Sequence, residues 1–268
     1  MPRSTATTRD AAARSSASAR SAIGAYRISY DIIDLGVNHY WDFRTNKLNT
    51  NSAQVVDLIS GLDVYYKGTS SIANIYAVDG YNADLERANS DYFKSEPTII
   101  NNGMTALTIF AWIKLESAVA GQIRSILAHW ESSTGNYRGF VFEIDDNHNM
   151  KLFLSPDGTF ANQAAYTTTE TLTDTSAWHF IVATYDTTNR GQFYLDTVQQ
   201  TTSLTTGSHP SSINSSEVPV VLGTIVPSAP ANFFDGLIGI CGIAENKSMS
   251  SSEITQLYNI TNTLGGYV

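Results

Sequence analysis

Cysteine is almost missing from this sequence, because Cys241 stands alone among 268 residues. A single cysteine excludes an intrachain disulfide, and with it the disulfide frameworks that stabilise many small secreted domains. Cys241 lies within the apolar stretch GLIGICGIA. We therefore predict that it is a buried small hydrophobic residue rather than a reactive thiol.

Long apolar runs are missing as well. No uninterrupted stretch approaches the roughly 20 residues that a membrane-spanning helix requires. Residues 1–27 lack the apolar core of a secretory signal peptide. We therefore expect neither a transmembrane segment nor a signal peptide. The location of the protein stays open, with a virion surface as one candidate.

Charge is scarce and unevenly distributed. Charged residues make up 15% of the chain, and the net charge is −9 at pH 7. Residues 1–27 carry five arginines against one aspartate, a net charge of +4, whereas the rest has 11 basic and 24 acidic side chains, a net charge of −13. An acidic body repels phosphate backbones, which argues against nucleic acid as its partner. The five arginines are Arg3, Arg9, Arg14, Arg20 and Arg27.

The first 37 residues are predicted to form an arm and a connector. Residues 1–27 are a low-complexity Ser/Ala/Arg segment, and three interpretations fit them: a solvated tail, an arm that docks onto other protein subunits, or an organelle transit peptide. Residues 28–37 contain several apolar side chains. These could pack on a partner or on the domain that follows.

From residue 38 onward the sequence is rich in strand signals. Apolar residues alternate with period two in about a dozen short stretches separated by turns. The clearest are a hairpin, Trp178–Tyr185 with Gly191–Val198, and a long strand, Ala106–Leu115. Residues 156–177 form a polar connection. One helix follows at the end, where Ser250 and Glu253 have the spacing of a capping box. This pattern predicts an all-β fold over 38–268, a jelly-roll sandwich of two antiparallel sheets.

The order of these stretches resembles the concanavalin A-like, laminin-G-type jelly rolls over residues 38–260. The chain opens with HYWDF, continues through LTIFAWIKLES to the hairpin SAWHFIVATYD and RGQFYLDTVQ, and closes with FDGLIGICGIAENKSMSSSEITQLYN. The resemblance implies the fold. It does not imply one function, because this fold hosts glycan binders, adhesion modules, hydrolases and virion surface proteins.

An enzymatic role is disfavoured by one missing carboxylate. Glycosidases with this fold carry two glutamates in a Glu-x-Asp-x-Glu motif, which retaining hydrolysis needs. Glu143 and Asp145 match the first two acidic positions, but Asn147 and His148 stand where the second glutamate belongs. We therefore predict a protein without catalytic residues.

Two kinds of binding site are candidates. The resemblance implies calcium binding at a loop rim, for which Asp145 and Asp146 offer oxygens, but a solvated turn is the favoured interpretation of these residues. No other cofactor is expected. Exposed aromatic rings stack on sugars, although tyrosine is also common on sheet surfaces. The candidates for glycan binding are Tyr65, Tyr66, Tyr81, Trp130, Tyr137 and Tyr166.

The favoured hypothesis is a non-catalytic structural or surface protein of a larger assembly, such as a virion decoration, fibre or capsid-associated protein. It would be docked through residues 1–37 and would display a jelly roll that could bind surface glycans. The alternative is a free-standing carbohydrate-binding or adhesion module. A polysaccharide-acting enzyme is the third and weakest hypothesis.

Overall fold

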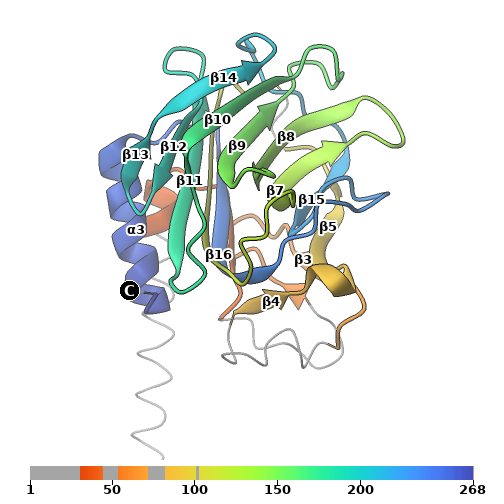
Figure 1. The fold of residues 1–268 in the computed structure, drawn as a ribbon. Coiled ribbons are helices and arrows are strands. Elements are labelled where there is room, and N and C mark those ends of the chain that lie inside the picture. The colour runs from red at the N-terminus through yellow and green to blue at the C-terminus, as the bar shows by residue number, and fades with distance from the viewer. Residues whose placement is uncertain (1–30, 45–53, 72–81, 101–102, 268) are drawn as a thin grey trace, which may run out of the picture.

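The chain folds into two β-sheets stacked face to face, with a helix against the outer side of one of them (Figure 1). The computed structural model describes residues 31–44, 54–71, 82–100 and 103–267. The strands pair antiparallel throughout these ranges. The jelly-roll sandwich predicted from the sequence is confirmed.

The first sheet has seven strands. In order across the sheet they are β1 (His39–Asp42), β16 (Gly236–Glu245), β6 (Ala106–Leu115), β11 (His179–Asp186), β12 (Gln192–Leu195) and β13 (Val198–Gln200), with β4 (Ala83–Leu85) also paired to β16.

The second sheet has nine strands. In order they are β14 (Thr202–Thr206), β10 (Ala164–Thr171), β9 (Asn149–Leu154), β8 (Tyr137–Ile144), β7 (Arg124–Glu131), β15 (Val218–Leu222), β5 (Tyr92–Thr98), β3 (Val64–Lys67) and β2 (Gln54–Val55). A short 3-10 turn, η1 (Arg87–Asn89), precedes β5.

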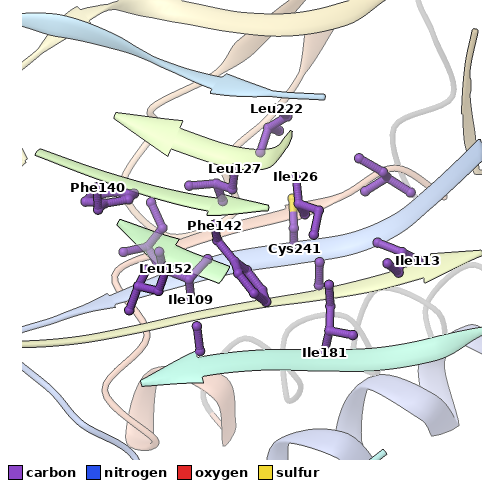
Figure 2. Close-up of a cluster of buried hydrophobic side chains, with 14 of the residues drawn as sticks. Ile109, Ile113, Ile126, Leu127, Phe140, Phe142, Leu152, Ile181, Leu222 and Cys241 are labelled. Carbon is purple, nitrogen blue, oxygen red and sulfur yellow. The ribbon is translucent and has the colours of Figure 1, made fainter. Parts of the chain in front are cut away.

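The space between the sheets is filled by the main hydrophobic core. Strand β6 directs Ile109 and Ile113 into it, and β8 contributes Phe140 and Phe142 from the opposite sheet (Figure 2). Cys241 lies among these side chains with no exposed surface, as predicted for a small hydrophobic residue. Burial of this kind contributes about 25 cal/mol for each Å² of apolar surface removed from water.

A second core lies on the outer face of the seven-stranded sheet. Phe110 and Trp112 of β6 and Phe180 of β11 point away from the sandwich interior and are buried there. The helix α3 (Ser251–Gly265) covers them, and Trp112 Nε1 donates a hydrogen bond to Thr261 Oγ1 at 2.8 Å. Both faces of this sheet are therefore buried. This explains why β6 and the β11–β12 hairpin are apolar at successive positions.

The boundaries of α3 follow from its end residues. The capping box predicted at its start is present: Ser250 Oγ accepts from the Glu253 amide, and Glu253 Oε2 accepts from the Ser250 amide at 2.8 Å. Gly266 ends the helix in the left-handed conformation, which glycine adopts without steric cost. In the part of the chain that the structure describes, no helix combines the length and the hydropathy needed to cross a bilayer.

The described part of the connector, residues 31–37, packs onto the sandwich. Residues 31–34 are helical, and Ile32, Leu35 and Val37 are buried in the second core beside α3. Of the two alternatives for residues 28–37, packing on the following domain is therefore the one observed for these three side chains. The arginines of residues 1–27 lie outside the described residues.

One stretch differs from the prediction. Residues 156–177 were expected to be a polar connection, but they contain the strand β10, and β14 follows after the hairpin. Both strands are rich in threonine. Threonine is polar by composition, yet its β-branched side chain favours extended backbone. The threonine content therefore concealed two strands.

His39 ties three segments together at one edge of the seven-stranded sheet. Its Nδ1 lies 2.9 Å from Asp57 Oδ2, and its Nε2 lies 2.8 Å from Glu245 Oε1. Burial disfavours the charged imidazolium, but the two carboxylates outweigh it and raise the pKa of His39 to about 9. At neutral pH His39 is therefore a cation between two acids.

Candidate functional site

The outer face of the nine-stranded sheet carries a small apolar patch. Alternation along the strands turns Trp130 of β7, Val141 of β8 and Phe153 of β9 away from the main core. Register places Phe153 opposite Val141, and Val141 opposite Ala128. Unlike the other sheet, this face has no helix over it in the described structure (Figure 1).

Two loops rise beside this patch and form a hollow of about 320 Å³. Residues 155–163 contribute one wall, and residues 223–235 contribute the other. The hollow combines aromatic, aliphatic and amide side chains with one cation and one carboxylate. The lining residues are Ile123, Trp130, Ser132, Arg138, Val141, Glu143, Phe153, Phe160, Gln163, Ile225 and Asn232.

The second wall is fixed by hydrogen bonds. Glu131 Oε2 accepts from the amide of Ser228 at 3.1 Å, and its other oxygen accepts from Ser133. Burial opposes ionisation of Glu131, but these hydrogen bonds lower its pKa to about 2. The loop closes on itself through backbone hydrogen bonds between Ile225 and Ala231. The wall is therefore preformed.

The first wall depends on a glycine. Gly158 has a φ of +81°, and a Cβ at this position would lie 2.0 Å from the carbonyl oxygen of Asn136. No other residue fits without displacing the backbone. The close approach lets the Gly158 carbonyl accept a hydrogen bond from Arg138 Nη1 at 3.2 Å. Phe160, two residues later, is left with 68% of its surface exposed.

Glu143 lies in the hollow with only 3% of its surface exposed. Burial is the main cause that raises its pKa to about 7, although Lys151 on the neighbouring strand and the Ser125 hydroxyl, 3.4 Å away, both favour the carboxylate. Among the described residues that line the hollow, Glu143 is the sole carboxylate. The pair of carboxyl groups that most glycosidases use is therefore not assembled by these residues.

The aromatic residues predicted to bind glycans are not gathered in one place. Trp130 lines the hollow but is only 6% exposed, so it serves as floor rather than as an open platform. Tyr137 is exposed at the start of β8, outside the lining. Tyr65 and Tyr66 lie on β3, and the Tyr66 hydroxyl donates to Asp91 at 2.5 Å. Tyr81 lies outside the described residues.

Tyr166 requires a correction. The sequence suggested a position near a loop, but Tyr166 belongs to β10 and is only 2% exposed. Its ring packs in the main core, and its hydroxyl lies 2.8 Å from His209 Nδ1. The side chain is therefore structural, because a ring this deeply buried cannot stack on a sugar.

The predicted calcium ligands are engaged in shaping a turn. Asp145 Oδ1 accepts from the amides of Asn147 and Asn149 at 2.9 and 3.0 Å. Asp146 Oδ1 accepts from the Asn147 side chain at 3.1 Å. This network explains both aspartates as turn residues. Within the described ranges, the carboxylates that do converge belong to Asp84, Glu86 and Glu116, whose oxygens lie within 4.8 Å of one another.

Several residues of the hollow carry no motif in the sequence. Arg138, Phe160, Gln163 and Asn232 come from a strand start and two loops, which only the tertiary fold brings together. One signal was available. In MKLFLS the core positions are Met150, Leu152 and Leu154, so Phe153 stands at an outward position where a polar residue is expected.

A protein-family model described as the concanavalin A-like lectin/glucanases superfamily matches residues 87–255, more than half of the chain. The chain belongs to this superfamily. The match covers most of the sandwich strands, including those that form the hollow. No curated protein sequence matches the chain.

Solved structures share this fold at low identity. The binding domain of botulinum neurotoxin serotype D is 14% identical with a TM-score of 0.55, and that of serotype C1 is 14% identical with a TM-score of 0.57. Trypanosoma rangeli sialidase is 12% identical with a TM-score of 0.52. The matches cover 84%, 84% and 85% of this chain but only 51%, 52% and 33% of the others, respectively. The likeness shows the fold alone.

Proposed function

We propose that this protein is a non-catalytic carbohydrate-binding jelly roll whose ligand occupies the hollow on the nine-stranded sheet. The observation that carries the proposal is the exposed ring of Phe160 on the first wall of a hollow whose second wall is preformed, with the side-chain amides of Gln163 and Asn232 also lining the hollow. Sugar rings have an apolar face that packs on aromatic side chains, and their hydroxyls exchange hydrogen bonds with amides.

The similar structures support this choice. They include botulinum neurotoxin type C, whose cell entry depends on interaction with two ganglioside molecules, the binding domain of botulinum neurotoxin DC in complex with SialylT, and Trypanosoma rangeli sialidase. Each of these proteins is longer than this chain, which covers 51%, 51% and 33% of them, respectively. The sole carboxylate among the described lining residues favours binding over hydrolysis.

A Phe160→Ala variant tests the proposal. We expect a glycan array to identify sugars that bind the intact protein, and we expect the variant to bind them at least about tenfold more weakly, because it loses the stacking surface. Tyr137→Ala is the matched control, since Tyr137 is also an exposed aromatic residue but does not line the hollow.

Two results would count against the proposal. One is the absence of any glycan signal at high protein concentration. The other is a loss of binding in Tyr137→Ala that equals the loss in Phe160→Ala. Release of reducing sugars that Glu143→Gln abolishes would instead establish an enzyme.

We propose further that the arginine-containing segment 1–27 docks the jelly roll onto a larger assembly, such as a virion decoration, fibre or capsid-associated complex. The charge of this segment, +4 against −13 for the rest of the chain, supports an electrostatic attachment to a partner distinct from the body. A free-standing binding module is the alternative.

Deletion of residues 1–30 separates these alternatives. The cut leaves Ile32, Leu35 and Val37 in place, so the sandwich should stay folded and keep its glycan binding. We expect the truncated protein to be lost from the assembly in co-sedimentation. Replacement of the five arginines by glutamine should have the same effect. Normal incorporation of the truncated protein would refute the docking role.

A further inference from the structure

Arg138 is the cation of the hollow, and its side chain is held in one orientation. Its Cζ lies 5.8 Å from the centroid of the Trp130 ring and 5.8 Å from that of the Phe160 ring. Contacts of a guanidinium with aromatic rings are attractive. Nη1 donates to Asn136 Oδ1 and to the Gly158 carbonyl, each at 3.2 Å. The guanidinium is therefore positioned before any ligand arrives.

The charge of Arg138 is not neutralised by the protein in the described structure. Arg44 pairs with Asp42, and Lys247 pairs with Glu253, but Arg138 forms no ion pair with a described carboxylate. Its two hydrogen bonds use Nη1 alone, and Nε and Nη2 have no acceptor among the described residues. An edge of the guanidinium is therefore available in a hollow that belongs to an otherwise acidic body.

We propose that the sugar bound in the hollow carries a carboxylate, and that Arg138 is the residue that recognises it. A guanidinium edge matches a carboxylate through two parallel N–H···O bonds, which add both affinity and orientation. Phe160 would then pack on the sugar ring next to the acid group, and Gln163 and Asn232 would bind its hydroxyls. This inference rests on the proposed function and specifies the class of its ligand.

The surroundings of Glu143 are consistent with an acidic ligand. Lys151 of β9 stands opposite Glu143 of β8 in the sheet register, and Ser125 of β7 lies on the other side. Asp145 and Asp146 follow on the same strand and turn, and their charges disfavour ionisation of Glu143. As the pH falls below 7, Glu143 is increasingly neutral, so a carboxylate ligand meets less repulsion from it.

The experiment compares matched pairs of oligosaccharides that differ only in the acid group. Sialyllactose against lactose, and oligogalacturonate against its carboxyl-reduced form, are titrated calorimetrically into the full chain at pH 6. We expect the acidic member of at least one pair to bind at least about tenfold more tightly. Arg138→Gln should remove this preference, and Arg138→Lys should keep part of it. Thermal melting checks that both variants are folded.

The outcomes separate the two proposals. Equal affinity for acidic and neutral members, or an unchanged preference in Arg138→Gln, overturns the inference while the proposed function stands. A sulphated lactose that binds more tightly than sialyllactose also overturns it, because the anion would not be a carboxylate. If neither member of either pair binds, the inference is overturned, and the proposed function fails with it only if the glycan array also gives no signal.

Discussion

Glu143 is a carboxylic acid in surroundings unlike those of an ordinary surface acid. Its carboxyl group is buried on the outer face of the sheet, and the resulting pKa of about 7 lies above the value of 4.5 for an unperturbed glutamate. An acid whose pKa is raised in the folded state contributes to the free energy of unfolding. This contribution is fully present below pH 4.5 and is lost as the pH rises through 7.

Glu143→Gln should therefore stabilise the protein at alkaline pH. At pH 8 the variant avoids a buried carboxylate, and we expect its free energy of unfolding to exceed that of the wild type by on the order of 3 kcal/mol. At pH 4 the two proteins should be equal. Urea denaturation at both pH values measures the difference. Glu96→Gln, at an exposed position of β5, is the control.

Equal stability of Glu143→Gln and the wild type at pH 8 would show that the Glu143 carboxylate is solvated, contrary to its burial in this structure. The same variant has a second use. Because Glu143 lines the hollow, its effect on glycan affinity at pH 8 reports whether the ligand senses this charge.

At the scale of elements, the imidazolium of His39 joins three segments of the chain. It links β1 to the end of β16 and to the loop that contains Asp57. A histidine with a raised pKa contributes stability that is fully present below its unfolded pKa of 6.5 and is lost as the pH rises through about 9.

The unfolding free energy of the wild type should therefore fall by about 3 kcal/mol between pH 6.5 and pH 9.5 through His39 alone. His39→Gln should be less stable at pH 6.5, because it leaves Asp57 and Glu245 without their cation. Its stability should also decrease less with pH. Urea denaturation across this range checks both, with His209→Gln as control. Parallel curves for His39→Gln and the wild type would contradict the assignment.

Strands were predictable from the sequence where every second residue, which lies on the same face of the sheet, is apolar. The hairpin β11–β12, the strand β6 and the capped helix α3 were each identified because alternation or a local capping pattern is visible in consecutive residues. Strands β10 and β14 were missed because threonine occurs on both faces of each strand, so no alternation of apolar and polar residues is visible. Local sequence patterns therefore predict where strands form, but they do not predict how deeply a side chain such as Tyr166 is buried.

The hollow was beyond the reach of sequence for a different reason. Trp130, Val141 and Phe153 become neighbours through the register of three strands, including two places where the β7–β8 register shifts. Phe160 and Asn232 join them only after two loops fold over the sheet. Register shifts and loop conformations depend on tertiary contacts, so a single sequence does not specify them.

At the scale of the whole molecule, the two faces of the sandwich are unequal. Helix α3 covers the outer face of the seven-stranded sheet together with residues 32–37 (Figure 1). The nine-stranded sheet carries the hollow on its own outer face. The chain therefore enters the domain on the side opposite the hollow. Fusion partners or tags placed before residue 31 should leave the hollow accessible.

This opposition has a consequence for avidity. Copies attached to a common scaffold through their N-terminal segments would be attached on the side of residue 31, opposite the hollow. Many sites of millimolar affinity, presented together to a glycan-coated surface, hold as one strong attachment while each sugar exchanges rapidly, because rebinding is intramolecular. A shallow hollow of about 320 Å³ would be sufficient for such polyvalent adhesion.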